Sequence, residues 1–250
     1  MTKYSPTIGL EIHAELKTQT KMFCGCKNDP LEKTPNKNVC PICLAHPGTL
    51  PTINKKAVEL LATVGYALGG KIREQAHFDR KSYFYPDLPK GYQISQYEEP
   101  FVEGGELVGI ELTRVHLEED TARLTHIIGE TGEVGRAKAR DFDKASGKLT
   151  VLKFREPESY SEIDFNRAGL PLMELVTEPV IKDADKALEF AKERQLIWRY
   201  LNASDADMEK GQMRVEVNVS VSKTDEFGTK VEVKNMNSFR CVHGALRFEV

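Results

Sequence analysis

Three stretches of the chain alternate apolar and polar residues, which is the pattern of half-buried β-strands. In residues 8–16 the isoleucines and leucines fall on one face, while Glu11 and His13 fall on the other. Residues 213–221 and 230–235 repeat the pattern, with valines on the inner face and charged or amide side chains on the outer one. Paired antiparallel, these last two strands would form a sheet with one apolar and one polar face.

Three other stretches have the periodicity of amphipathic helices. Asn54 is placed to cap a helix that runs to residue 68, and Asp183 is placed to cap a second helix that runs to residue 201. A third helix is expected from Ser238 to the last residue. Because a domain boundary rarely falls inside an amphipathic run, we expect the chain to be truncated. Residues 129–158 are charged, with a single apolar patch, and are predicted to form a protruding hairpin.

Composition restricts the class of protein. The chain has 250 residues, of which 40% are hydrophobic and 29% charged, as in a soluble protein of one large or two small domains. The net charge of −3 argues against binding nucleic acid over the whole surface. No apolar run is long enough to span a membrane, and residues 1–6 have the pattern of neither a secretion signal nor a transit peptide. The odd number of cysteines, five, favours a reducing compartment, so we expect the protein in the cytoplasm.

Four of the five cysteines form two close pairs. Cys24 and Cys26 are separated by one residue, Cys40 and Cys43 by two, and the stretch between the pairs is polar. Such a loop has no core of its own, and four thiolates could fix it around a structural zinc ion. The alternative is a set of four reduced thiols.

Residues 78–96 form the densest stretch of aromatic and basic side chains. Two prolines and a glycine within it exclude a regular helix or a central strand. An ordered loop of this composition suits an anionic, partly planar ligand such as a nucleotide or an RNA end. The alternative is a surface loop with its rings tucked beneath it.

An acidic run follows the strand predicted over residues 108–117. Glu118, Glu119 and Asp120 would repel one another unless a cation or solvent separates them, and alternation places Glu119 on the opposite face from the other two. The run could hold a metal ion or form a solvated acidic turn. Residues 166–169 are predicted to form a tight turn, whose arginine could hold a phosphate or a carboxylate, or pair with Glu174.

The polar faces of the predicted strands carry further candidates. Glu11 and His13 lie about 6.5 Å apart along one strand, so they could reach one metal ion, or they could simply be solvated. Arg214, Glu216 and Lys234 could likewise line a cleft for ATP and magnesium, or face solvent. The sequence contains no P-loop, no dinucleotide-binding glycine motif and no nucleophile-elbow serine motif, so a nucleotide site would have to be of another kind.

Six segments together resemble the family formed by the B subunits of aspartyl/glutamyl-tRNA amidotransferases. They occur in the family's order and span nearly the whole chain: Ile8–His13, Cys40–Pro51, Phe78–Gln96, His116–Asp120, Asp164–Gly169 and Glu232–Phe239. The resemblance implies an α+β fold, a cradle rich in antiparallel sheet with flanking helices and a small zinc-binding loop at 24–43. It also implies that this chain is the catalytic cradle, without the helical domain and the tRNA-binding tail that follow in the family.

The resemblance implies a ligase. A member of this family uses ATP and Mg²⁺ to phosphorylate the side-chain carboxylate of mischarged Glu-tRNA(Gln), Asp-tRNA(Asn) or both. Ammonia then displaces the phosphate and gives Gln-tRNA or Asn-tRNA for translation. A glutaminase (amidase) subunit supplies the ammonia through a channel, and a small third subunit completes the heterotrimer. The activation is chemically sound because an acyl phosphate is a far better acyl donor than a carboxylate.

The resemblance also assigns roles to residues by matching position. It implies catalytic roles for a set of acidic and basic residues: Glu118, Glu119, Glu216, Lys81 and Lys90. It implies that another set binds or shapes the nucleotide pocket: Arg80, Lys81, Tyr83, Tyr85, Arg214 and Lys234. Magnesium ligands would be Glu11, His13, Glu119 and Glu216, and zinc ligands Cys24, Cys26, Cys40 and Cys43.

Three departures from the family pattern stand out. Thr121-Ala122-Arg123 replaces an expected Ala-Gly-Lys, Val215 replaces a cysteine, and residues 129–158 are longer than expected. Two other classes remain open beside the amidotransferase. A non-catalytic zinc-containing RNA-binding module would bind RNA without ATP turnover. A metal-dependent hydrolase using Glu11, His13 and the acidic run would act without ATP.

Overall fold

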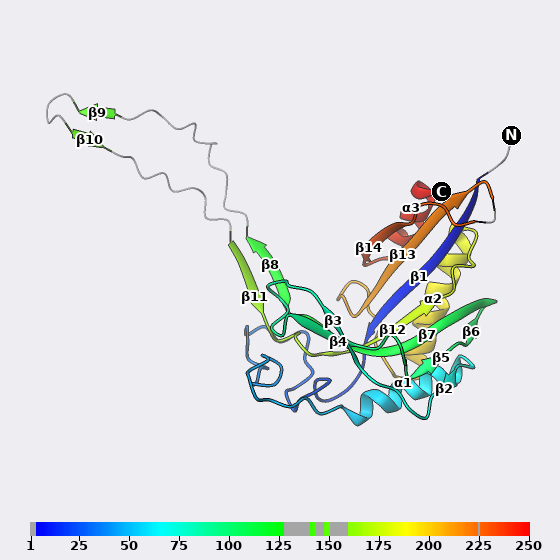
Figure 1. The fold of residues 1–250 in the computed structure, drawn as a ribbon, viewed down its shortest axis with the longest axis horizontal. Helices are drawn as coiled ribbons and strands as arrows, with labels where there is room; N and C mark the ends of the chain where they lie inside the picture. Colours follow the sequence, from blue (N-terminus) through cyan, green and yellow to red (C-terminus); the bar gives the residue numbers. More distant parts are fainter. Residues whose placement is uncertain (1–3, 128–140, 144–147, 151–159, 225) are drawn as a thin grey trace.

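A computed structural model describes residues 4–127, 141–143, 148–150, 160–224 and 226–250. Its centre is an eight-stranded sheet in which neighbouring strands are antiparallel (Figure 1). The strand order is β14–β13–β1–β12–β7–β5–β2, and β6 also pairs with β7. The strands are β1 (Ser5–Glu15), β2 (Lys71–Ile72), β5 (Val102–Glu103), β6 (Glu106–Leu107), β7 (Ile110–Glu119), β12 (Pro171–Thr177), β13 (Met213–Ser222) and β14 (Val231–Met236).

The cross-strand register gives the central strands one apolar and one polar face. Ile12 on β1 lies opposite Val215 on β13, whereas His13 lies opposite Arg214 on one side and Glu174 on the other. Directly opposed residues of antiparallel strands project from the same face of the sheet. The alternation predicted from the sequence is therefore confirmed for β1 and β13, whose apolar residues join one core.

Three helices of the described chain contribute to the core on the apolar face: α1 (Lys55–Ala67), α2 (Ala184–Tyr200) and α3 (Phe239–Glu249). Each begins at a side-chain cap: Asn54, Asp183 and Ser238 accept hydrogen bonds from backbone N–H groups of the first turn, and the first two caps were predicted from the sequence. None of the described helices has both the length and the apolar character needed to cross a membrane.

Helix α1 lies unusually close to the sheet at Gly65. A Cβ atom at this position would lie 2.5 Å from Cγ2 of Val102 on β5. Glycine is therefore required for this packing.

Arg194 on α2 is fully buried in the core. Its guanidinium lies 4.2 Å from the ring centroid of Trp198, and its Nη2 lies 4.0 Å from Sδ of Met173. Among the described residues, Nε and Nη1 have no hydrogen-bond partner. Burial holds the pKa of Arg194 well below its usual range, because the core disfavours its charge.

Two segments differ from the sequence-based expectation. Residues 78–96, expected as an irregular loop, form a hairpin of β3 (Asp79–Ser82) and β4 (Tyr92–Ser95), and both prolines lie in the connection between the strands. The central strand β12 was not predicted as a strand. It is buried along almost its whole length, so its sequence is a nearly continuous apolar run without alternation.

The hairpin predicted for residues 129–158 lies mostly outside the described residues. Within it the structure describes β9 (Asp141–Asp143) and β10 (Lys148–Thr150), which pair antiparallel. The flanking strands β8 (Arg123–Ile127) and β11 (Tyr160–Asp164) form a further two-stranded ladder. The α+β class with an antiparallel sheet and flanking helices is thus confirmed for the described part of the chain.

Candidate active site

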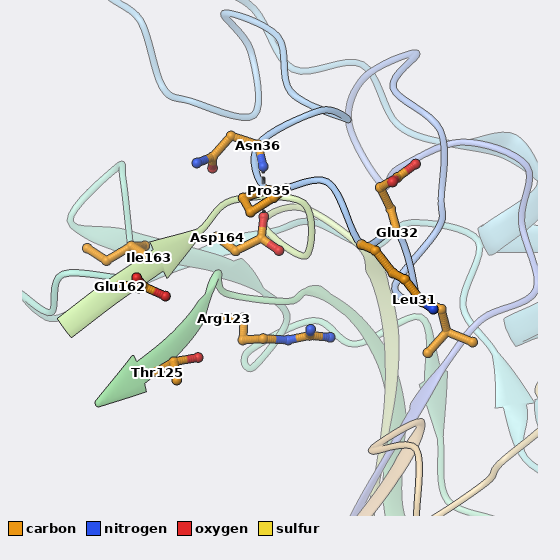
Figure 2. Close-up of a pocket in the computed structure, with 10 residues that line it drawn as sticks. Leu31, Glu32, Pro35, Asn36, Arg123, Thr125, Glu162, Ile163 and Asp164 are labelled. Atoms are coloured by element: carbon orange, nitrogen blue, oxygen red, sulfur yellow. Dashed lines mark hydrogen bonds between the residues drawn. The ribbon is translucent and has the colours of Figure 1, made fainter. Parts of the chain in front are cut away.

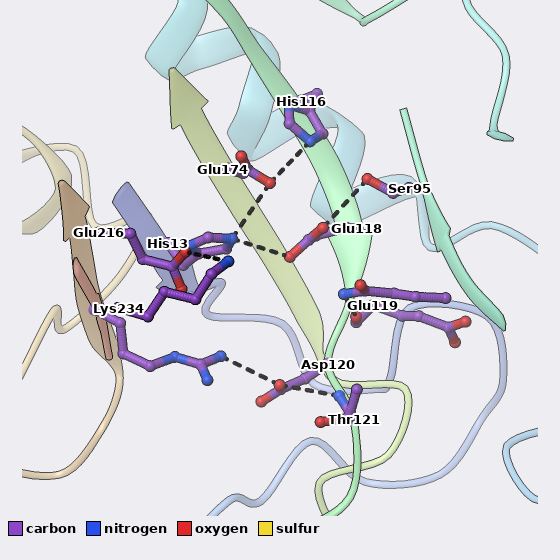
Figure 3. Close-up of polar contacts among 12 residues, drawn as sticks. His13, Ser95, His116, Glu118, Glu119, Asp120, Thr121, Glu174, Glu216 and Lys234 are labelled. Carbon is purple, nitrogen blue, oxygen red and sulfur yellow. Dashed lines mark hydrogen bonds and ion pairs between the residues drawn. The ribbon is translucent and has the colours of Figure 1, made fainter. Parts of the chain in front are cut away.

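His13 lies at the centre of a cluster on the polar face of the sheet (Figure 3). Its Nε2 atom is 3.3 Å from Oε1 of Glu118 and 3.3 Å from Oε2 of Glu174. Nε2 of His116 lies 3.2 Å from that same Glu174 oxygen. The strands β1, β7 and β12 are separated widely in the sequence, and their register alone brings these groups together.

The electrostatics of the cluster favour charged groups in spite of burial. Burial alone would lower the pKa of His13, but its hydrogen bonds to Glu118 and Glu174 raise that pKa to about 10. Burial would also raise the pKa of Glu174, yet the hydrogen bonds from His116 and His13 hold it well below its usual range. One ligand atom each from His13, Glu118 and Glu174 lie within 4.8 Å of one another, so this set could hold a metal ion that displaces the His13 proton.

A second acidic group lies on the same face. Carboxylate oxygens of Glu11, Glu216 and Glu232 lie within 4.8 Å of one another, from β1, β13 and β14. Lys234 Nζ lies 3.3 Å from Glu216 and 3.0 Å from Glu232, and Asn218 donates a 2.8 Å hydrogen bond to Glu11. This set could also accept a divalent cation, with Lys234 partly neutralising it.

Glu119 faces away from His13, as alternation predicts. Its carboxylate oxygens lie 2.8 and 2.9 Å from Lys90 Nζ, and one of them accepts a hydrogen bond from Ile94 N–H. Burial raises the pKa of Glu119 and Lys90 offsets part of that effect. The connection of the β3–β4 hairpin therefore places Lys90 at the end of β7, beside the acidic run.

Asp120 is held by two arginines. Arg167 Nε donates to Asp120 at 3.1 Å, and Arg214 Nη2 lies 3.3 Å from its other oxygen. Burial would raise the pKa of Asp120, but the two guanidinium groups lower it. Arg167 also lies 2.7 Å from Glu15, so this arginine holds carboxylates, as predicted for the turn. A pairing of Arg167 with Glu174 is wrong, because Glu174 faces the two histidines.

A cavity of about 470 Å³ opens beside these clusters. Its lining includes cationic and anionic side chains: Arg80, Lys81, Arg114, Glu11, His116 and Glu174. Arg80 stacks over Tyr92 at 4.7 Å and Arg114 over Tyr97 at 4.9 Å, measured to the ring centroids. Nδ1 of His116 is buried and has no hydrogen-bond partner among the described residues.

A second cavity, of about 680 Å³, lies between the cysteine-rich loop (residues 24–43) and the β8–β11 ladder (Figure 2). Arg123 and Asp164 line it, and both are tied to that loop: Arg123 donates to Pro30 O, and Asp164 accepts from Asn36 N–H. The cavity is larger, but none of the clustered carboxylates and histidines of the polar face lines it. The clustered carboxylates and histidines therefore lie at the smaller cavity and not at the larger one.

The four cysteines converge as their spacing predicts. The Sγ atoms of Cys24, Cys26, Cys40 and Cys43 lie within 4.8 Å of one another, and all four are free thiols. The backbone N–H of Cys40 donates to Cys43 Sγ at 3.1 Å. The hydrogen bond from Cys24 lowers the pKa of Cys43 to about 5. Four converging sulfurs fit a structural metal site.

A model of the family described as the GatB/GatE catalytic domain matches residues 6–250. The chain belongs to this family. It is 43% identical to the chloroplastic/mitochondrial B subunit of the glutamyl-tRNA(Gln) amidotransferase of Ostreococcus lucimarinus, over 100% of this chain and 48% of that protein. It is 41% identical to the B subunit of the aspartyl/glutamyl-tRNA(Asn/Gln) amidotransferase of a Picosynechococcus species, over 100% of this chain and 49% of that protein. The corresponding protein of Thermodesulfovibrio yellowstonii is 43% identical, over 99% and 48%.

The resemblance seen in the sequence is thereby confirmed. The chain spans about half the length of the curated relatives it matches. The predicted magnesium ligands of this chain lie in three places. His13 joins Glu118 and Glu174, Glu11 and Glu216 join Glu232, and Glu119 pairs with Lys90.

Of the predicted nucleotide-binding residues, Arg80 and Lys81 line the 470 Å³ cavity. Arg214 contacts Asp120 and Lys234 contacts Glu216, at two other points of the polar face. Tyr83 and Tyr85 lie in the connection after β3, 36% and 53% exposed, outside the lining of that cavity. Burial raises the pKa of Tyr83 to about 12.

Sequence reasoning missed four residues of this face: Glu174, Glu232, Arg114 and His116. Glu174 carried a signal, since it is a lone carboxylate inside the apolar run of β12. Arg114 carried none, because an arginine on a half-buried strand is ordinarily solvated.

Proposed function

We propose that this chain is the carboxylate-activating part of a tRNA-dependent amidotransferase. In the proposed reaction, ATP phosphorylates the side-chain carboxylate of Glu-tRNA(Gln), Asp-tRNA(Asn) or both. Ammonia then attacks the acyl phosphate, and phosphate leaves to give Gln-tRNA or Asn-tRNA. The family and the names of the relatives support this reaction, since those relatives are amidotransferase B subunits.

One observation carries the proposal to this chain: the two acidic sets and the cavity with basic side chains share one face of one sheet. Phosphoryl transfer needs little covalent chemistry from the protein and relies on positioning and charge neutralisation. A divalent cation at either acidic set would neutralise phosphate charge. Arg80, Lys81 and Arg114 would contact phosphate oxygens in the 470 Å³ cavity.

Around that cavity, each remaining group takes a role from its contacts. Glu11, His13, Glu118, Glu174 and Glu216 would hold magnesium. The Lys90–Glu119 pair lies on the other side of β7 from His13 and outside the lining of that cavity, so Lys90 would act by holding the acidic end of β7 in place.

Further roles follow at the rim of the face. Lys234 would partly neutralise the negative charge of the cluster of Glu11, Glu216 and Glu232. Arg214 would hold the Asp120 carboxylate in position. Tyr83 and Tyr85, being exposed on the hairpin, would contact the aminoacyl end of the tRNA.

The proposal includes an assembly. A glutaminase (amidase) subunit would supply ammonia through a channel, a small third subunit would complete a heterotrimer, and the protein would act in the cytoplasm. The four cysteines would hold a structural zinc ion, which fixes a loop without a core. Contacts with the body of the tRNA would come from the part of the relatives that this chain does not span.

The test uses the chain with a glutaminase partner, Glu-tRNA(Gln), magnesium and ammonium chloride, with and without ATP. Gln-tRNA and ADP are followed together. ATP-dependent formation of both supports the proposal, and Glu119→Ala and Glu216→Ala should each abolish amide formation while glutaminase activity of the assembly persists.

Other outcomes identify the alternatives. Bound tRNA with neither product would favour the zinc-containing RNA-binding module. Hydrolysis of the aminoacyl ester or another bond without ATP would favour the metal-dependent hydrolase. ADP release without Gln-tRNA would mean that the acceptor is a different carboxylate.

A further inference from the structure

Lys21 is a fully buried lysine that has no carboxylate partner among the described residues. Its Nζ atom lies 3.7 Å from Sγ of Cys43 and donates a hydrogen bond of 3.2 Å to the backbone oxygen of Phe165. A buried ammonium group is costly unless a negative group compensates it. The group within reach of Nζ that can carry a negative charge is the thiolate of Cys43.

The chemistry of that cluster explains the compensation. Four thiolates carry four negative charges and a divalent ion carries two positive ones, so a zinc-loaded cluster has a net negative charge. An N–H···S hydrogen bond from Lys21 would spread this charge and stabilise the thiolates.

Lys21 also joins the cluster to the acidic end of β7. The backbone N–H of its neighbour Met22 donates to Gly169 O at 2.8 Å, and Gly169 N–H donates to Asp120 O at 2.9 Å. Lys21 itself donates to Phe165 O, at the other end of the same turn. This turn carries Arg167.

The turn at residues 166–169 packs against both the cysteine cluster and Glu119. A Cβ atom on Gly169 would lie 3.6 Å from Cys43 Cβ, 3.8 Å from Lys21 Cδ and 4.0 Å from Glu119 Oε2. Gly169 has a φ of +82°, a conformation that other residues rarely adopt. A single glycine therefore separates the cysteine cluster from Glu119, so displacement of the cluster would also displace the acidic run.

We propose that Lys21 is a positioning residue that neutralises the metal-loaded cysteine cluster and couples it to the turn that carries Arg167. In this arrangement the cluster does more than order its own loop. Its charge holds the Lys21 ammonium in place, and Lys21 holds the turn that presents Arg167 to Asp120. This inference rests on the proposed zinc site.

The experiment compares Lys21→Met with wild type in zinc affinity, by competition with a chelating indicator. Lys27→Met is the matched control, because Lys27 lies on the same segment but is exposed and pairs with Asp29. Lys21→Met should lower zinc affinity by about 10- to 100-fold, as removal of an outer partner of a metal ligand typically does. With Co²⁺ in place of zinc, the thiolate-to-metal absorption band of Lys21→Met should shift relative to that of wild type. Lys27→Met should change neither the zinc affinity nor this band.

Urea unfolding separates this role from simple packing. Lys21→Met should lose more stability in the zinc-loaded protein than in the zinc-free protein, because the charge that Lys21 compensates is larger when zinc is bound. An equal loss in both states, with unchanged zinc affinity and cobalt spectrum, would overturn the inference. Failure of wild type to bind zinc would instead overturn the zinc site of the proposed function, and this inference with it.

A measurement on wild type covers the case in which Lys21→Met does not fold. Hydrogen exchange at the amides of Met22 and Gly169 is compared before and after zinc removal. We expect both amides to lose protection when zinc is removed, because both donate hydrogen bonds across the turn. Unchanged protection would show that the cluster and the turn are independent, and would overturn the coupling.

Discussion

Glu15 offers the most quantitative test of the electrostatics of this fold. Its carboxyl group ends β1 and is only 7% exposed. Arg167 Nη2 lies 2.7 Å from Glu15 Oε1, but this oxygen makes no aligned hydrogen bond among the described residues. Burial therefore outweighs the attraction of Arg167, and the pKa of Glu15 rises from an ordinary 4.5 to about 7, with Asp120 adding to the rise.

The pKa difference converts directly into stability. Each pH unit between the folded and unfolded pKa corresponds to about 1.4 kcal/mol, so the rise from 4.5 to about 7 corresponds to about 3 kcal/mol. The folded chain binds the Glu15 proton more tightly than the unfolded chain does. The contribution of Glu15 to stability is therefore fully present below pH 4.5 and is lost as the pH rises to about 7.

Glu15→Gln removes this ionisation and keeps the shape of the side chain. The free energy of unfolding of Glu15→Gln, measured by urea denaturation, should exceed that of wild type by about 3 kcal/mol near pH 8 and match it at pH values near 4.5. Glu209→Gln, at an exposed position, is the matched control and should show no such pH-dependent difference.

Two results would refute this reasoning. If Glu15→Gln were less stable than wild type at pH 8, the ion pair with Arg167 would outweigh burial. If the difference between variant and wild type were the same at both pH values, the effect would come from packing and not from ionisation.

Three further predictions follow from single contacts. Arg194→Met should raise the free energy of unfolding by about 1–4 kcal/mol, because it removes a buried unpaired charge; a loss in urea denaturation would contradict this. Lys90→Met should lower ATP-dependent amide formation by about 100-fold, because Glu119 loses its cation; an unchanged kcat would exclude that role. Gly65→Ala should destabilise the chain by about 1–3 kcal/mol, because its methyl group collides with Val102; an unchanged melting temperature would show that β5 can move away.

The parts of the fold that the sequence predicted are those with strong local signals. Strict alternation in β1 and β13 reflects one buried and one polar face, and Asn54 and Asp183 mark helix starts through their own side chains. The strand β12 was missed because both of its faces are covered, one by the core and one by the polar cluster, so it shows no alternation. The hairpin at 79–95 was missed because each of its strands has only four residues and β3 is mostly exposed.

The candidate site shows the same contrast between local signals, which the sequence reveals, and long-range contacts, which it does not. The cysteine cluster was predictable because its ligands are close in sequence and their spacing is restrictive. The grouping of His13 with Glu118 and Glu174 was not, because it depends on the register of three strands that are far apart in the chain. The resemblance grouped Glu119 with His13 as magnesium ligands, whereas alternation along β7 turns Glu119 toward Lys90.

The central claim is that the polar face activates a carboxylate by phosphorylation. The most direct measurement follows an oxygen isotope from a Glu-tRNA(Gln) whose glutamate side-chain carboxylate is labelled with ¹⁸O. If an acyl phosphate forms, one labelled oxygen leaves with phosphate when ammonia attacks, so each Gln-tRNA should be accompanied by one ¹⁸O-labelled inorganic phosphate. Gln-tRNA formation with unlabelled phosphate would contradict the claim, because ATP would then be hydrolysed by water without activating the carboxylate.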